Sequence, residues 1–150
     1  MKSFLVKGKK PIIKWGMLPD ECYYEGKVPE GYSLAICPSE GYIVVDVDVS
    51  DKKNGFDSIP EHLKKELDST LNYPTKRLGR HYWFKYSGSE ILANKTSNQG
   101  IDLRTNNGYV VWYPKGDVRN KLHKIKKTSK KMNSWLESLF SYIHTMNETK

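Results

Sequence analysis

The sequence predicts an α+β domain in which an antiparallel sheet carries acidic side chains and helices flank the sheet. Three observations favour this class. Residues 42–50 alternate in the manner of a strand, and residues 101–113 contain two strand-like runs around a turn sequence. Hydrophobic residues at helical spacing mark residues 132–146, which we expect to form an amphipathic helix docked on the core.

The clearest strand is YIVVDVDVS, residues 42–50, in which β-branched residues dominate. Side chains alternate between the two faces of a strand. Val44, Asp46, Asp48 and Ser50 are therefore expected on one face, with the remaining hydrophobic residues on the other.

The other strands are expected to be shorter. Residues 1–15 are basic and interleaved with hydrophobic side chains, which predicts one or two short strands or loops. The prolines and glycines of residues 16–31 favour a loop. Residues 32–37 and the aromatic run 81–86 are typical of strands.

A helix is predicted from about Ser58 to Ser69. Ser58 is a candidate N-cap, and Glu61 three residues later would complete a capping box. Ile59, Leu63 and Leu67 are four residues apart, so they would form one buried stripe.

A polar loop at residues 93–100 leads into a predicted β-hairpin. Its strands would be Ile101–Arg104 and Tyr109–Tyr113, joined by Asn106-Asn107-Gly108. Ile101 and Leu103 would face one way, and Asp102 and Arg104 the other.

The chain has 150 residues, which suits one domain. We expect a core at about residues 9–114, a basic segment at 115–131 and the C-terminal helix. The net charge is +8, and the basic segment holds eight Lys and Arg against one Asp. A basic domain favours an anionic partner, most often nucleic acid.

Two cysteines without a C-x-x-C pair indicate neither a zinc site nor a disulfide framework. No run is apolar enough for a signal peptide or a membrane span. We therefore expect a cytoplasmic protein without a membrane partner.

The acidic pair Asp46 and Asp48 indicates a metal site. On one strand face the two side chains start roughly 6.5–7 Å apart. Two charges at that distance repel by about 2 kcal/mol at an effective dielectric constant of about 20, unless a cation lies between them. Carboxylate ligands suit Mg²⁺ or Mn²⁺. A solvated pair on an exposed face is the simpler alternative.

Asp102 would join the pair if its strand is a neighbour of the first. Three carboxylates holding two metal ions is an arrangement for nucleotidyl transfer, in which one ion activates a 3′-hydroxyl and the other stabilises the leaving pyrophosphate. A surface ion pair is the alternative for Asp102. His81 follows Gly79-Arg80 and could donate a hydrogen bond to a phosphate, with Lys76, Arg77 and Arg80 nearby. From the residues alone, however, a packed or half-exposed histidine is the favoured interpretation.

The order of these motifs resembles the bifunctional primase-polymerase domain of phage and plasmid replication proteins, in the archaeo-eukaryotic primase superfamily. The matching strings are VVDVDV, GRH at Gly79–His81, ID at Ile101-Asp102, the trailing GYVV with its proline, and the opening KKPIIKW. The resemblance spans roughly residues 9–114. It implies an RRM-like antiparallel sheet that carries the catalytic carboxylates.

The resemblance also implies roles for individual residues. Asp46, Asp48 and Asp102 would bind two Mg²⁺ or Mn²⁺ ions and be catalytic. His81 would contact the triphosphate of the incoming nucleotide, with Gly79 and Arg80 beside it. The spacing adds Arg104, which could contact the template, a phosphate or the carboxylates.

The implied function is that of a DNA primase/polymerase in phage or plasmid replication. Its partners would be a DNA template or primer-template, ribo- or deoxyribonucleoside triphosphates, and a replicative helicase acting in trans. Six lysines of the basic segment are expected to bind nucleic acid: Lys121, Lys124, Lys126, Lys127, Lys130 and Lys131.

Other classes explain the acidic residues less well. DVDVS also suits a haloacid-dehalogenase-type phosphatase with Asp46 as nucleophile, but Gly116-Asp117 is not followed by a second acid. A D-x-D glycosyltransferase would be much longer, and a rolling-circle nuclease would need an H-x-H motif. The open alternative is a catalytically inactive relative that binds nucleic acid through residues 115–131.

Overall fold

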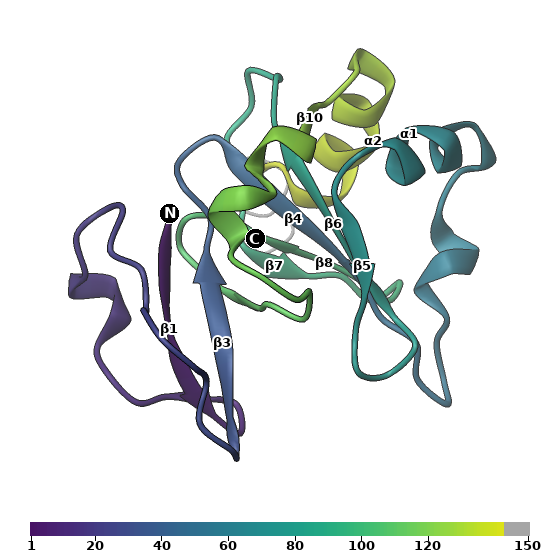
Figure 1. The fold of residues 1–150 in the computed structure, drawn as a ribbon. Coiled ribbons are helices and arrows are strands. Elements are labelled where there is room, and N and C mark those ends of the chain that lie inside the picture. Colours follow the sequence, from purple (N-terminus) through teal and green to yellow (C-terminus); the bar gives the residue numbers. More distant parts are fainter. Residues whose placement is uncertain (143–150) are drawn as a thin grey trace.

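The computed structural model describes residues 1–142, which form two β-sheets and two α-helices (Figure 1). The larger sheet has the strand order β10-β6-β4-β8-β7, with the short strand β5 paired to β6. The smaller sheet has the order β2-β1-β3-β9. This combination of sheets and helices is compatible with the predicted α+β class.

Strand β4 (Tyr42–Val47) lies at the centre of the larger sheet, where its β-branched residues are buried on both faces. Strands β6 (Arg80–Lys85) and β8 (Ile101–Arg104) pair with it, both antiparallel. The remaining strands of this sheet are β5 (Asn72–Pro74), β7 (Lys95–Thr96) and β10 (Lys126–Lys127), of which β10 runs parallel to β6.

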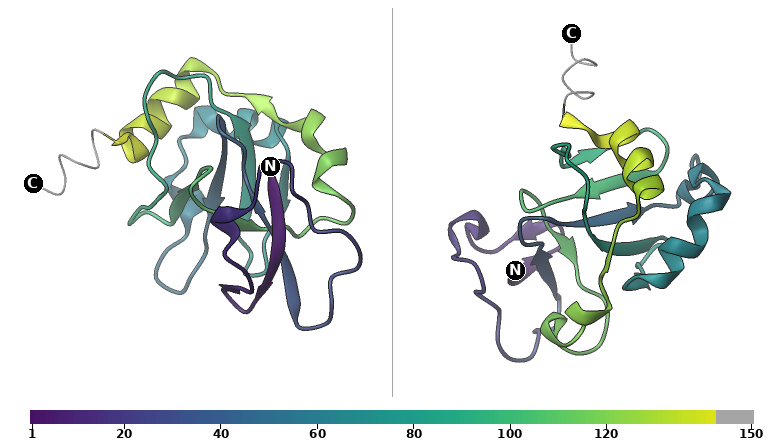
Figure 2. Two further views of the ribbon diagram at one scale, coloured as in Figure 1. Left: turned by 90° about the vertical axis from the view of Figure 1, so that its left-hand side faces the viewer. Right: turned by 90° about the horizontal axis from the view of Figure 1, so that it is seen from above.

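The two faces of the larger sheet are covered by different parts of the chain. On one face, Val45 and Val47 pack with Leu67 of helix α1 and with helix α2. On the other face, Val44 and Trp83 pack with Met1, Ile36 and other buried residues near the smaller sheet. Accordingly, the N-terminal strands and α1 lie on opposite sides of the larger sheet in Figures 1 and 2.

The smaller sheet is built mainly by the first 37 residues. Its strands are β1 (Lys2–Lys7), β2 (Lys10–Pro11), β3 (Tyr32–Cys37) and β9 (Val110–Val111). The short basic strands predicted within residues 1–15 and the strand at residues 32–37 are therefore confirmed. Phe4 stacks on the half-buried Trp15, which anchors the loop after β2.

The predicted hairpin of residues 101–113 is wrong. The turn itself forms, and in it the N–H of Gly108 donates to the carbonyl oxygen of Thr105 at 3.0 Å. After the turn the chain leaves the larger sheet, and β9 pairs with β3 in the smaller one. Val110 and Trp112 are buried there, and this burial outweighs continuation of the hairpin. The free edge of β8 is instead paired with β7, inside the predicted polar loop.

The predicted capping box at Ser58 is also wrong. Ile59 and Pro60 have ψ angles of 123° and 136°, outside the helical region. Ile59 precedes a proline, and a residue in that position is disfavoured in the helical region. The Ser58 hydroxyl instead donates to the carbonyl oxygen of Gln99 at 3.0 Å. The segment forms 3-10 turns followed by α1 (Lys64–Ser69). Within residues 1–142 the 3-10 turns, η1 to η5, are Trp15–Met17, Gly55–Ser58, Glu61–Leu63, Val118–Asn120 and Leu122–Lys124.

Helix α2 spans Lys130–Phe140 and is capped by Ser129, whose hydroxyl oxygen accepts from the N–H of Met132 at 3.1 Å. Its buried stripe packs against the larger sheet, as predicted. The expected continuation of the stripe through residues 143 and 146 lies outside the described residues. Within residues 1–142, no helix is long and apolar enough to cross a membrane.

Candidate active site

Two of the predicted carboxylates lie on neighbouring strands and share one face of the larger sheet. Asp46 of β4 is directly paired with Asp102 of β8 in the antiparallel register, and directly paired residues point to the same side. Asp48 follows the end of β4. One carboxylate oxygen from each of the three residues lies within 4.8 Å of the others. The prediction that these strands are side by side is confirmed.

Loop backbone, rather than a strand, holds Asp48 in place. Strand β4 ends at Val47, whereas the sequence predicted a strand that continues to residue 50. The N–H of Asp48 donates to the carbonyl oxygen of Gly100 at 2.8 Å, and its own carbonyl oxygen accepts from the N–H of Gly55 at 2.8 Å. A β-carbon on Gly55 would lie 2.2 Å from the carbonyl oxygen of Gly100. The role of these two glycines at the site was not predicted from the sequence, although Asn54-Gly55 is a turn signal.

The ionised forms of Asp48 and Asp102 are disfavoured by their surroundings. Burial, and then the neighbouring Asp46 and Asp102, raise the pKa of Asp48 to about 7. Burial and Asp46 also raise the pKa of Asp102, while Arg104 opposes the rise. The Nη2 atom of Arg104 lies 3.8 Å from Oδ2 of Asp102. Arg104 therefore lies beside the carboxylates, as its spacing predicted.

His81 is buried on β6 directly opposite Asp46. Its Nε2 atom lies 3.4 Å from Oδ1 of Asp46. Its Nδ1 atom lies 3.2 Å from the hydroxyl of Tyr73, which also accepts from the indole N–H of Trp83 at 2.9 Å. The histidine is thus both a packed residue, as the simpler interpretation predicted, and a neighbour of the carboxylates.

Gly79 and Arg80 do not reach the carboxylates. A β-carbon on Gly79 would lie 2.2 Å from the carbonyl oxygen of Val47, so the close approach that requires glycine is to strand β4 and not to a ligand. Arg80 pairs with Val47 and therefore points to the opposite face from His81. Its Nε donates to the side chain of Asn72 at 2.6 Å.

The carboxylates line a cavity of about 890 Å³, which we call the carboxylate cavity. His81 and Tyr113 also line it, together with residues of both sheets. Four cationic side chains from three loops are among its lining residues: Lys9, Lys53, and the neighbours Lys76 and Arg77. Lys76 and Arg77 were expected near a bound phosphate from the sequence. Lys9 and Lys53 were not, because no local sequence pattern relates them to the acidic strand.

The carboxylates suit a divalent cation in both chemistry and spacing. Oxygen ligands at about 2.0–2.6 Å from an ion can lie about 4–5 Å apart across it, which matches the separation of the three groups. Among the described residues, Oδ1 of Asp46 is buried without a hydrogen-bond partner. A cation would satisfy that oxygen and relieve the repulsion, so these residues fit Mg²⁺ or Mn²⁺.

A protein-family model matches most of the chain. Residues 10–134 match the N-terminal domain of bifunctional DNA primase/polymerases, a span that includes the three carboxylates and His81. The chain belongs to this family. A search of curated proteins found no match for this primase/polymerase domain. The family predicted from the sequence motifs is confirmed.

The fold of the primase/polymerase domain separates the six lysines that were predicted to bind nucleic acid. Lys121, Lys124 and Lys126 line a second cavity. Lys127 follows Lys126 on β10 and points to the opposite face of that strand. The pair Lys130–Lys131 forms the start of α2. The six lysines therefore do not all line one cavity.

Proposed function

We propose that this primase/polymerase domain joins nucleotides on a DNA template by metal-dependent nucleotidyl transfer from ribo- or deoxyribonucleoside triphosphates. One observation carries the proposal: Asp46, Asp48 and Asp102 come within 4.8 Å of one another in a cavity lined by cations. Clustered carboxylates suit divalent metal, and surrounding cations suit a triphosphate. The family match supports the same chemistry.

Two Mg²⁺ or Mn²⁺ ions at the carboxylates would activate the 3′-hydroxyl of the growing strand and stabilise the leaving pyrophosphate. The chain itself supplies a preorganised anionic site. Asp46 and Asp102 are held on paired strands, and Asp48 is held by the loop hydrogen bonds to Gly55 and Gly100. This rigidity supports accurate placement of the reacting groups.

The cationic residues would orient the triphosphate. His81 is fixed by the Tyr73 hydroxyl, and its Nε2 lies 3.4 Å from Oδ1 of Asp46. Once a cation is bound to that oxygen, the Nε2–H would be released to donate to a phosphate oxygen in the cavity. Lys76 and Arg77 would add charge-assisted hydrogen bonds. Arg104 is assigned a different role, because its contact with Asp102 favours the ionised form of that carboxyl.

We also propose a setting for this activity. The domain would act in phage or plasmid DNA replication, with a primer-template as partner and a helicase acting in trans. The motif resemblance described above supports this setting. In the same proposal the larger sheet serves as the RRM-like platform that carries the carboxylates.

A primer-extension assay tests the proposal with purified chain, labelled primer-template, nucleotides and Mn²⁺ or Mg²⁺. Asp46→Asn, Asp48→Asn and Asp102→Asn should each reduce extension by at least about 100-fold, since even outer-shell partners of metal ligands typically cost 10–100-fold. Asp51→Asn is the matched control, because it removes the same charge from an exposed residue nearby. That control should extend primers normally.

Two results would contradict the proposal. One is normal extension by the Asp46→Asn/Asp48→Asn double variant. The other is a wild-type chain that binds primer-template but never extends it with either metal, which would favour the inactive nucleic-acid-binding relative.

A further inference from the structure

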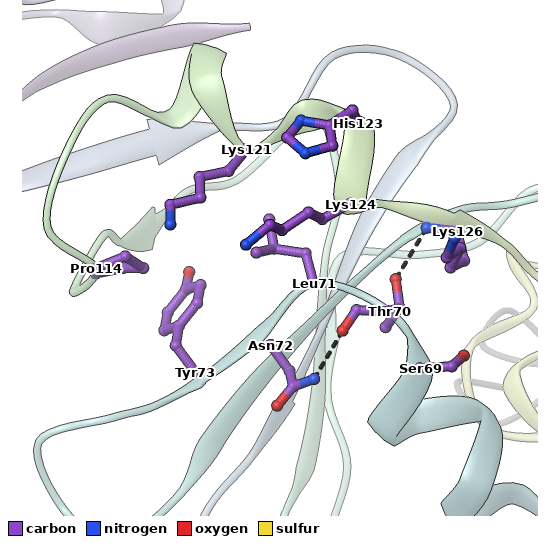
Figure 3. Close-up of a pocket in the computed structure, with 10 residues that line it drawn as sticks. All are labelled: Ser69, Thr70, Leu71, Asn72, Tyr73, Pro114, Lys121, His123, Lys124 and Lys126. Carbon is purple, nitrogen blue, oxygen red and sulfur yellow. Dashed lines mark hydrogen bonds between the residues drawn. The ribbon is translucent and has the colours of Figure 1, made fainter.

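A second cavity of about 500 Å³ lies where the basic segment meets strand β5 (Figure 3). We call it the lysine pocket. Its lining residues are Ser69, Thr70, Leu71, Asn72, Tyr73, Pro114, Lys121, His123, Lys124 and Lys126. The ammonium groups of Lys121 and Lys124 both point into the space above Tyr73 (Figure 3).

The two walls of the lysine pocket are joined by hydrogen bonds that main-chain N–H groups donate. The N–H of Leu71 donates to the carbonyl oxygen of Lys124 at 3.0 Å. The N–H of Lys126 donates to the hydroxyl oxygen of Thr70 at 2.9 Å. The lysines therefore project from backbone that is fixed to the larger sheet, rather than from a freely moving linker.

The pocket concentrates positive charge without an internal counter-charge. None of its lining residues is Asp or Glu, and within residues 1–142 no ion pair involves Lys121, Lys124 or Lys126. Arg119 of the same segment differs, because its guanidinium binds Asp117 and Glu25. Several unpaired cations around one hollow attract an external anion.

Apart from His123, the neutral polar side chains of the pocket are already used inside the protein. The hydroxyl of Ser69 donates to the backbone carbonyl oxygen of Glu66, and the hydroxyl of Thr70 donates to the backbone carbonyl oxygen of Trp83. The amide of Asn72 donates to the Thr70 carbonyl oxygen at 2.7 Å and accepts from Arg80. The lysines are thus the main donors left for a ligand, which suits a phosphate and not the edge of a base.

The lysine pocket and the carboxylate cavity share a wall. Tyr73 lines the lysine pocket, and its ring lies 5.2 Å from that of His81 and 6.5 Å from that of Tyr113, measured between centroids. His81 and Tyr113 line the carboxylate cavity, whereas the next residue, Pro114, lines the lysine pocket. A chain of phosphates that passes the carboxylates would therefore continue to the lysines.

We propose that the lysine pocket binds the sugar-phosphate backbone of a nucleic-acid strand that leads away from the carboxylate cavity. That the anion is a strand rests on the proposed function, whereas the anion site rests on the pocket itself. A metal-bound triphosphate fits less well, because the pocket has no carboxylate to share the metal.

Fluorescence anisotropy of a labelled oligothymidylate tests this with the full chain in EDTA and without nucleotide. Lys121→Ala/Lys124→Ala should flatten the slope of log K against log salt by about 1.4, and weaken binding at least about tenfold at 0.1 M salt. Lys121→Arg/Lys124→Arg should keep most of the affinity. Oligodeoxyadenylate should give the same results, because phosphate contacts carry no sequence information.

Lys130→Ala/Lys131→Ala is the matched control, since it removes the same charge from the same segment outside the pocket. Its salt slope should stay close to that of the wild type. Equal losses in the two alanine variants, or no loss in the pocket variant, would overturn the proposal. So would a pocket variant that loses binding of tripolyphosphate while oligonucleotide binding is unchanged.

The outcomes also separate this inference from the proposed function. A chain that binds oligonucleotide through the pocket but never extends a primer supports the inference and contradicts the function. Primer extension together with unchanged oligonucleotide binding by the pocket variant supports the function and overturns the inference.

Discussion

The hydroxyl oxygen of Tyr73 lies 3.2 Å from Nδ1 of His81 and accepts a hydrogen bond from the indole N–H of Trp83. Because Trp83 can only donate, the hydroxyl hydrogen of Tyr73 is free to point at Nδ1. A neutral His81 then carries its proton on Nε2, toward Asp46. Tyr73 therefore orients the histidine, and when its hydroxyl donates to Nδ1 it favours the tautomer with the proton on Nε2.

Replacing Tyr73 with phenylalanine should keep the ring packing but remove this hydroxyl. The buried N–H of Trp83 loses its partner, so the free energy of unfolding should fall by about 1–3 kcal/mol, measured by urea denaturation. The KM for nucleotide should rise while Mn²⁺ affinity changes little. Tyr24→Phe is the control, because its hydroxyl bond to Lys27 is exposed. Unchanged stability and KM in Tyr73→Phe would contradict this role.

The metal-free protein should lose stability as pH rises through the titration of Asp48. Its pKa is raised from 3.8 to about 7 in the folded state. Between these values the folded state binds more protons than the unfolded state, so stability falls as pH increases. Asp48→Asn should therefore be more stable than wild type at pH 8, by about 1 kcal/mol after allowance for solvent screening.

Thermal denaturation in EDTA between pH 4 and pH 8 measures this effect. The difference between Asp48→Asn and wild type should shrink toward pH 4 and grow toward pH 8. The Asp51→Asn control should follow the wild-type curve. A difference that does not depend on pH would show that Asp48 titrates normally.

Divalent metal should stabilise the fold through the carboxylates. At a Mn²⁺ concentration of about 100 times Kd, binding adds about 2.7 kcal/mol, which corresponds to a rise in Tm of about 5–10 °C for a chain of this size. The rise should be larger at pH 8 than at pH 6, because protons compete for Asp48. Asp102→Asn should lose the rise and Asp51→Asn should keep it. An equal rise in both variants would locate the metal elsewhere.

Gly79→Ala should destabilise the protein by about 1–3 kcal/mol, the usual cost of overpacking. Its β-carbon would lie 2.2 Å from the Val47 carbonyl oxygen. Gly16→Ala is the control, because a β-carbon there meets nothing within 4 Å, and it should change stability by less than about 0.5 kcal/mol. Urea denaturation measures both. Normal stability combined with lost nucleotide binding would instead make Gly79 a ligand contact.

Several features could be predicted from the sequence because they depend on local periodicity. The alternation of residues 42–47 arises from strand geometry, so it predicted the strand and the shared direction of its acidic side chains. The spacing of Met132, Leu136 and Phe140 predicted the buried face of α2 in the same way. The order of the short motifs was sufficient to identify the family.

Tertiary structure decided which distant segments meet. No local pattern shows that β9 pairs with β3 instead of β8, because the deciding energy is the burial of Val110 and Trp112 beside Ile36, more than 70 residues earlier in the chain. For the same reason, the position of Lys9 and Lys53 at the carboxylate cavity could not be predicted from the sequence.

The difference between what sequence and tertiary structure determine is clearest in the basic segment. Composition alone determined that residues 115–131 are positively charged. Only the fold decided that Lys121, Lys124 and Lys126 line one pocket while Lys127 points away. Net charge follows from residue type, but the positions of Lys124 and Lys126 follow from hydrogen bonds between their backbone and Leu71 and the Thr70 hydroxyl across the fold.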